Sequence, residues 1–158
     1  MKFYNNYPNQ IKQGMKAEDT FKAVAEKLGH VVIQATLADD KYSHIDCYVN
    51  GSAFDVKSAK SLGFIVETIN NWGYPGWIYG QSNYIAVVYN TYIKIYSRKA
   101  ILELVQSKII DKTIYQSSEP NKVFYRLYTR FKQYGWRDNF ILVDPLDLYK
   151  LELRTWII

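Results

Sequence analysis

The sequence predicts one α/β domain in which a mixed central sheet is flanked by helices. Apolar residues at helical spacing indicate an amphipathic helix from about Lys16 to Leu28, and Gly29 is a natural stop for it. Asn50-Gly51 separates two runs of alternating residues, which is the strongest short-range signal for a β-hairpin. Asn83–Tyr89 is almost wholly apolar, as expected of a strand in the centre of a sheet. Together these patterns favour an α/β sandwich.

The predicted elements follow one another along the chain. The first helix carries its apolar stripe on Ala17, Phe21, Val24 and Leu28. Strands are predicted where β-branched, aromatic or alternating residues gather, at His30–Thr36, His44–Val49, Ser52–Ser58, Phe64–Ile69, Asn83–Tyr89 and Tyr92–Tyr96. The strand at Phe64–Ile69 either extends the hairpin sheet or follows it. Ser97 is a good cap for a helix over Arg98–Ile109, and Asp144-Pro145 is a good start for a final helix.

The second half of the chain is less regular. Lys122–Arg137 fits either a strand or a helix, and we expect a strand at Val123–Thr129. At 158 residues the chain is long enough for one domain but short for two. We divide this domain into a core of about residues 14–97 and a C-terminal extension of about residues 98–158.

The composition suits a polyanionic partner. The net charge is +5, the sequence pI is about 9.1, and 16% of the residues are aromatic, including fifteen Tyr. Basic side chains neutralise phosphates and flat rings stack on bases, so a nucleic acid is one fitting partner. The alternative is a solvated basic surface on a protein that uses Tyr in its core. Composition does not decide between the two.

Several classes of protein are excluded or disfavoured. Cys47 is the only cysteine, so an internal disulfide and a Cys-rich zinc site are excluded. Phosphate-binding Gly-Lys-Ser/Thr and dinucleotide-binding Gly-x-Gly-x-x-Gly patterns are absent from the sequence. There is no signal-like start and no apolar run of membrane-spanning length. We therefore expect no membrane partner and a cytoplasmic location.

The hairpin gathers ionisable residues on one face. If Asn50-Gly51 is the two-residue turn, Asp46 lies opposite Asp55 and His44 lies opposite Lys57. Two carboxylates facing each other across a sheet repel, which disfavours the arrangement unless a cation binds between them. Lys57, one pleat along from Asp55, could reach a developing negative charge. These groups are sufficient for metal-assisted phosphodiester hydrolysis.

The same residues resemble a known family pattern. Asp46, eight intervening residues, and then Asp55-Val56-Lys57 resemble the PD-(D/E)xK nuclease superfamily, which includes restriction enzymes and archaeal-type Holliday-junction resolvases. Gly14 to Glu18 resembles the GxxxE start of the helix that often supplies a further acidic residue in that family. Ile45 stands where the family's name has Pro. The resemblance covers about the first 97 residues and implies a restriction-endonuclease-like α-β-β-β core.

What the resemblance implies about activity is specific. It implies a metal-dependent DNA endonuclease in which Asp46, Asp55 and Glu18 bind Mg²⁺ or Mn²⁺ and Lys57 stabilises the transition state. The short chain favours a structure-directed enzyme, such as a homodimeric junction resolvase, over a sequence-specific restriction enzyme. The alternatives are a non-catalytic nucleic-acid-binding module and a nuclease-like subunit that binds protein. RNA as the substrate also stays open.

Further residues are candidates for contacts with the substrate. Lys122–Arg137 combines five basic residues with six aromatic ones and no acidic one, which suits either a DNA-gripping surface or an amphipathic core element. The aromatic loop around Trp72, Tyr74, Trp77 and Tyr79 either lines a DNA cleft or closes the core, and Gln81 follows it. Glu67 is either a further metal or substrate ligand or an ion-pair partner of Lys60. The expected nucleic-acid-binding residues are Arg126, Arg130, Lys132, Lys60 and His44.

Overall fold

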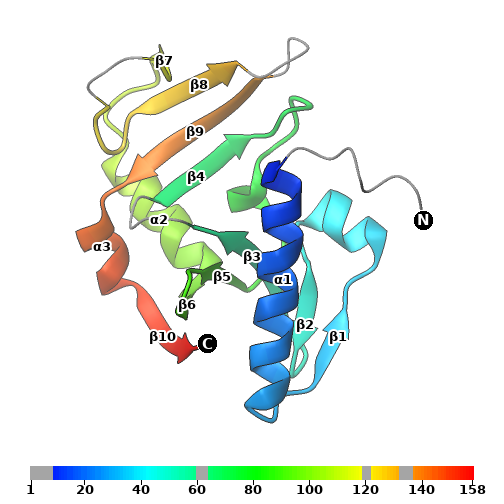
Figure 1. The fold of residues 1–158 in the computed structure, drawn as a ribbon. Coiled ribbons are helices and arrows are strands. Elements are labelled where there is room, and N and C mark those ends of the chain that lie inside the picture. The colour runs from blue at the N-terminus through cyan, green and yellow to red at the C-terminus, as the bar shows by residue number, and fades with distance from the viewer. Residues whose placement is uncertain (1–8, 60–63, 119–121, 132–136) are drawn as a thin grey trace.

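In the described residues the fold has two sheets and three α-helices, and α1 (Asn9–Lys27) covers one face of the larger sheet (Figure 1). The computed structural model describes residues 9–59, 64–118, 122–131 and 137–158. The larger sheet has the strand order β1-β2-β3-β5-β6-β10 and the smaller one the order β4-β9-β8-β7. The strands are β1 (Val32–Gln34), β2 (Cys47–Val49), β3 (Ser52–Ser58), β4 (Phe64–Ile69), β5 (Tyr84–Val88), β6 (Tyr92–Ser97), β7 (Ile114–Gln116), β8 (Leu127–Phe131), β9 (Arg137–Val143) and β10 (Glu152–Ile157).

Helix α1 is formed as its apolar stripe predicts, but with different ends. It begins at Asn9, earlier than expected, and Gly29 adopts a φ of +85° just beyond it. Ala17, Phe21 and Val24 are buried against the larger sheet. Leu28 was expected to continue the stripe and does not, because the helix has already ended at Lys27 and the Leu28 side chain is 52% exposed.

The hairpin has the predicted register but is shorter than predicted. Residues 47, 48 and 49 pair with residues 54, 53 and 52, and Asn50 and Gly51 both adopt positive φ in the turn. The regular ladder stops at the pair Cys47 and Phe54, because the Asp46 N–H donates to the Phe54 carbonyl at 2.8 Å instead of continuing the pairing. The predicted ladder pairs of Asp46 with Asp55 and of His44 with Lys57 are therefore wrong.

The larger sheet is mixed, as predicted. β3 and β5 are parallel, whereas the other neighbouring strands are antiparallel. β5 is central, and Ile85, Ala86 and Val87 are fully buried in it. β10 was not predicted from the sequence; it pairs with β6 and forms one edge of the sheet.

The smaller sheet joins segments that are far apart in the sequence. β4 pairs with β9 rather than with the hairpin, so Phe64–Ile69 follows the first sheet and does not extend it. β8 is the strand expected in Lys122–Arg137, but it begins at Leu127, after Tyr125 has adopted a φ of 61°. The described part of that region is thus a turn followed by a strand.

The two remaining helices begin at the predicted caps. The Ser97 side chain accepts a hydrogen bond from the Ala100 N–H at the start of α2 (Arg98–Lys108). The Asp144 side chain accepts one from the Leu146 N–H at the start of α3 (Pro145–Lys150). Among the described residues, no helix is long and apolar enough to cross a membrane.

Two apolar clusters hold these layers together. One lies between α1 and the larger sheet, and the other lies between the opposite face of that sheet and β4, β9, α2 and α3. Phe21 is fully buried in the first cluster, where its ring packs between Phe54 at 5.1 Å and Trp156 of β10 at 5.5 Å. The C-terminal strand therefore helps to bury the first helix.

Phe21→Ala should lower the free energy of unfolding by about 3–5 kcal/mol, because it removes a buried ring and leaves a cavity between Phe54 and Trp156. Leu28→Ala is the matched control in the same region, and we expect a change of about 0.5 kcal/mol or less because Leu28 is exposed. Urea denaturation of both variants measures the difference. Equal effects would contradict the packing described for α1.

Candidate active site

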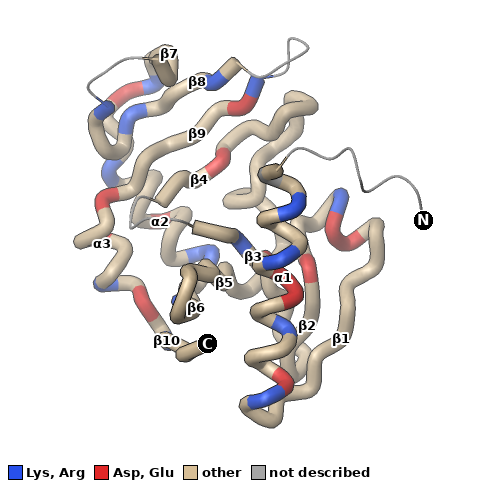
Figure 2. Tube along the Cα trace, in the orientation of Figure 1, with Lys and Arg blue, Asp and Glu red and all other residues tan. Residues whose placement is uncertain are grey.

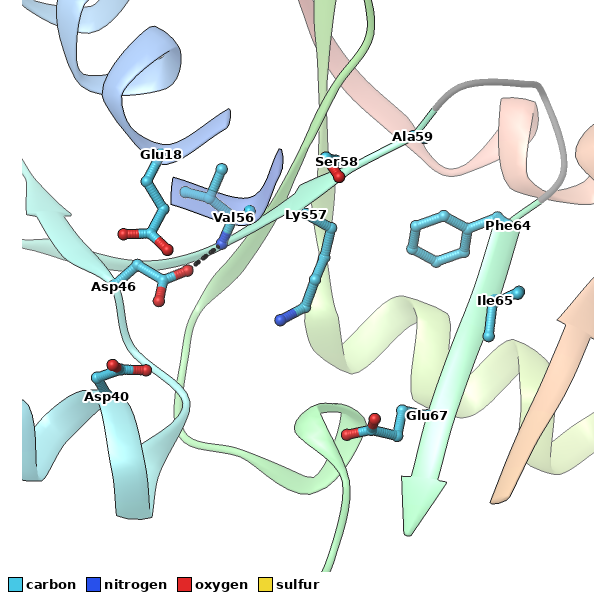
Figure 3. Close-up of a pocket in the computed structure, with 11 residues that line it drawn as sticks. Glu18, Asp40, Asp46, Val56, Lys57, Ser58, Ala59, Phe64, Ile65 and Glu67 are labelled. Carbon is cyan, nitrogen blue, oxygen red and sulfur yellow. Dashed lines mark hydrogen bonds between the residues drawn. The ribbon is translucent and has the colours of Figure 1, made fainter. Parts of the chain in front are cut away.

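A pocket of about 600 Å³ lies where α1, the loop before β2, β3 and β4 meet (Figure 3). Four acidic side chains line it and point toward its centre, where Lys57 extends from β3. These acidic residues are Glu18, Asp40, Asp46 and Glu67. Figure 2 shows basic and acidic residues along α1, a basic residue on β3 and an acidic residue on β4.

The pocket exists because β3 is longer than its pairing with β2. Past Phe54, β3 continues to Ser58 beside β5 alone. The Val56 N–H, which has no β2 partner there, donates to Asp46 Oδ2 at 2.6 Å. One carboxylate oxygen of Asp46 therefore replaces the backbone carbonyl that a neighbouring strand would have supplied. This hydrogen bond holds the Asp46 carboxylate at the pocket.

Asp55 and Lys57 form a close pair beneath the pocket. The Asp55 side chain is buried, with the residue 1% exposed, and its Oδ1 lies 2.5 Å from Lys57 Nζ. Within the described part of the chain, Asp55 Oδ2 is buried without a hydrogen-bond partner. Lys57 Nζ also lies 5.6 Å from the centre of the Trp77 ring. A buried carboxylate oxygen without a donor is costly, so this atom could accept a ligand.

The charges of this pair are shifted by burial and by each other. Burial raises the pKa of Asp55 to about 8; the Lys57 ammonium opposes that shift and the negative charge of Asp46 adds to it. Burial alone would lower the pKa of Lys57, but the negative charges of Asp55 and Asp46 outweigh it and leave that pKa above its ordinary value. The ammonium form of Lys57 is therefore favoured at neutral pH, whereas burial disfavours the charged form of Asp55.

Glu18 is placed opposite Asp46 by α1. It follows the buried Ala17 on the helix and points across the pocket, as Figure 3 shows. Burial and then the negative charges of Asp46 and Asp40 raise the pKa of Glu18 to about 7. The sequence-predicted residues Glu18, Asp46, Asp55 and Lys57 are thus brought together, although Asp46 and Asp55 are not a ladder pair.

Asp40 belongs to this site and was missed in the sequence. It lies in a π-helical turn, Asp39–Ser43, between β1 and β2. The Thr36 N–H and hydroxyl both hydrogen-bond to the Asp39 carboxylate, so Asp39 is held by the loop while Asp40 lines the pocket. Burial and the negative charge of Asp46 raise the pKa of Asp40. The one available signal was an acidic pair just before the hairpin.

Glu67 also lines the pocket, and its role as a further ligand stays a prediction. It comes from β4 of the smaller sheet, and its negative charge contributes to the raised pKa of Lys57. Lys60, the alternative partner proposed for Glu67, lies outside the described residues, as does Lys132.

The expected substrate-contacting residues are spread over the molecule. His44 precedes β2, and its Nε2 lies 3.3 Å from the Pro75 carbonyl in a neighbouring pocket that Gln81 also lines. Burial lowers the pKa of His44. Arg130 forms two hydrogen bonds with the buried Asp138 carboxylate, at 3.1 and 2.6 Å, and the Arg126 guanidinium lies 4.3 Å from the Tyr115 ring. Both arginines belong to the smaller sheet region and not to the carboxylate pocket.

The aromatic loop divides between core and surface. Trp77 is buried in the cluster beneath the smaller sheet, whereas Trp72, Tyr74 and Tyr79 are exposed. Cys47 is buried, and burial raises its pKa to about 12. Its thiol is therefore inert at neutral pH, as expected from its inward-facing position.

The donor set suits a divalent cation in charge and in chemistry. Among the described residues, no three acidic, Cys or His side chains are already grouped at metal-binding distances, and Lys57 Nζ lies against Asp55. The site nevertheless holds more carboxylates than cationic groups. Burial is the largest cause of the raised pKa values of Glu18, Asp40 and Asp55, and repulsion by the negative charge of Asp46 adds to each. Carboxylate oxygens are the ligands that Mg²⁺ and Mn²⁺ prefer, and a cation would relieve that repulsion.

Comparisons of the chain with protein-family models, with curated proteins and with solved structures gave no match. The pocket brings carboxylates together around the Lys57 ammonium group, which is partly exposed and pairs with the buried Asp55.

The metal-free protein should lose stability as the pH rises from about 4 to 8 through Asp55, because the unfolded chain releases this proton near its ordinary pKa of 3.8 and the folded chain near 8. Asp55→Asn removes this effect. In EDTA, the variant should melt close to the wild type at about pH 5 and several degrees above it at about pH 8, since each 1 kcal/mol is worth about 2–4 °C at this size.

Asp138→Asn is the matched control, because Asp138 is equally buried but is held by two hydrogen bonds from Arg130. It should lower the melting temperature at both pH values. If Asp55→Asn also lowers it at both, Asp55 is an ordinary structural ion-pair partner.

Proposed function

We propose that this protein is a divalent-metal-dependent nuclease that hydrolyses phosphodiester bonds in DNA. The observation that carries the proposal is the convergence of Glu18, Asp40 and Asp46 on Lys57 in one pocket, with Asp55 buried beneath it and paired with Lys57. A purely structural site would pair its charges, whereas this one keeps an excess of carboxylates and a buried oxygen without a donor.

Each residue has a role that follows from its position. Asp46, Asp55 and Glu18 would hold Mg²⁺ or Mn²⁺, which when bound acidifies water and screens the phosphate charge. Asp46 is fixed by the Val56 N–H, which leaves its second oxygen for a ligand. Lys57 keeps its proton at neutral pH and extends into the pocket, so it can stabilise negative charge that develops on the phosphate.

The fold is consistent with the family pattern at the level of element order. A helix carrying Glu18 is followed by β1, the hairpin β2–β3 with Asp46, Asp55 and Lys57, and later by the parallel strand β5. We include in the proposal that this is a restriction-endonuclease-like core. β4 lies in the second sheet and adds Glu67 to the pocket.

Lys57→Ala should lower the rate of DNA cleavage in Mg²⁺ or Mn²⁺ by about a hundredfold or more while DNA binding persists, because transition-state stabilisation is lost. The assay uses supercoiled, linear, single-stranded and four-way-junction DNA with and without metal. Lys94→Ala is the matched control, since Lys94 is also partly buried in the larger sheet and is paired with Glu152 at 2.6 Å. Equal cleavage by both variants would remove Lys57 from the mechanism.

Mg²⁺ or Mn²⁺ should raise the melting temperature of the wild type by about 5–10 °C at a concentration of about 100 Kd, because the metal binds the folded site. Asp46→Asn should lose most of that increase, although its amide oxygen can still accept from the Val56 N–H. Asp19→Asn, on the exposed side of α1 and paired with Lys22, should keep it. An unchanged melting temperature in the wild type would count against a metal site.

A further inference from the structure

A second pocket, of about 830 Å³, adjoins the carboxylate pocket. The two share Asp40, so they are neighbouring parts of one hollowed surface. The second pocket has a different chemistry, because its walls are aromatic rings and its polar groups are mainly amide, imidazole and backbone groups. Its aromatic residues are Tyr42, Trp72, Tyr74 and Tyr79.

These rings are exposed to solvent and do not pack in the core. Trp72 is 66% exposed, Tyr74 is 68% exposed and Tyr79 is 51% exposed, whereas Trp77 of the same loop is buried. With Tyr42, which is 73% exposed, four large exposed rings surround one hollow and form an apolar surface that folding alone does not explain. Such a surface beside a candidate active site indicates a binding role.

The backbone that carries the rings is held in place. The Asn70 side chain accepts hydrogen bonds from the Trp72 and Tyr74 N–H groups, and the Gly76 N–H donates to the Thr68 carbonyl. Gly76 packs so closely that a Cβ there would lie 2.2 Å from the Glu67 carbonyl oxygen. The loop thus presents its rings from a fixed frame, which lowers the entropy lost on binding a flat ligand.

The hollowed surface continues beyond the aromatic pocket. Trp72 also lines a third pocket, of about 740 Å³, together with Gln116, Arg137 and Asn139 of the smaller sheet. The three pockets are therefore joined in series, first through Asp40 and then through Trp72. An extended polymer could therefore run from the carboxylate pocket, across the aromatic pocket, to the exposed Arg137.

We propose that the aromatic pocket binds an unpaired nucleobase next to the phosphate held at the carboxylate site, so that the substrate is DNA with single-stranded character. This inference rests on the proposed nuclease function. Trp72 and Tyr74 would stack on the base. The Asn70 side-chain NH₂, whose amide oxygen already holds the loop, would donate to the edge of the base, and Gln81 in the same pocket could donate or accept. A base inside an intact duplex is stacked between its neighbours and would have to leave the helix to enter.

The first test measures binding without cleavage, by fluorescence anisotropy of a labelled oligonucleotide in EDTA. The single strand should bind more tightly than the blunt duplex of the same sequence. Trp72→Ala and Tyr74→Ala should each weaken single-strand binding by about tenfold, the effect of losing one stacking contact, and Trp72→Phe should restore it. Tyr149→Ala is the matched control, since Tyr149 is as exposed as Tyr74 but lies on α3, and it should have no effect.

The second test places the base relative to the cut. Where single-stranded or junction DNA is cleaved in Mg²⁺ or Mn²⁺, an abasic residue is moved along the strand. Cleavage should be slower when the abasic residue lies at one particular position beside the cut. In Trp72→Ala, an abasic residue at that position should no longer slow cleavage. If no abasic position slows cleavage, or if the duplex binds as tightly as the single strand, the proposed base-binding pocket is wrong and the nuclease proposal stands. Binding that needs Trp72 and Tyr74 without any metal-dependent cleavage overturns the nuclease proposal and keeps the pocket. No binding of any oligonucleotide overturns the inference.

Discussion

The site depends on one mismatch in strand length. β2 ends its pairing with β3 at Phe54, while β3 continues beside β5 to Ser58. The uncovered edge leaves room for a pocket and leaves the Val56 N–H to be satisfied by Asp46. If β2 extended further, the Val56 N–H would pair with the β2 backbone. The Asp46 carboxylate would then lose the hydrogen bond that holds it in the pocket. The same short contact therefore satisfies the backbone and positions a candidate ligand.

Local signals in the sequence predicted those parts of the fold that are stabilised locally. The turn at Asn50-Gly51 needs positive φ at both residues, and Ser97 and Asp144 bond to backbone N–H groups a few residues away, so short sequence windows contain the whole cause. The partner of β4 is different, because β9 follows it by about half the chain and no short window holds both strands. β10 was missed for the same reason.

In the candidate site, too, the residues on regular elements could be predicted from the sequence, and the irregular features could not. Alternation and the turn bring Asp46, Asp55 and Lys57 together, and helical spacing brings Glu18 to the pocket. The detailed pairing was not predictable, because it depends on where β2 stops, which the Asp46 N–H decides by bonding to the Phe54 carbonyl. Asp40 was invisible because an irregular turn, and not a periodic element, carries it. Arg130 was predicted to bind DNA because Lys122–Arg137 contains no acidic residue. Its partner in the structure, the buried Asp138, lies one position beyond that segment.

The stack of Trp156 on Phe21 bears on how the chain can acquire its structure during synthesis. The ribosome makes α1 first and β10 near the end of the described chain, yet the two share one apolar cluster. Until β10 arrives, the ring of Phe21 lacks one of its covers, and β6 lacks its edge partner. Docking of the first helix can therefore be completed only after nearly all of the described chain has been synthesised. Nascent chains would meanwhile expose an aromatic surface that chaperones recognise and that promotes aggregation.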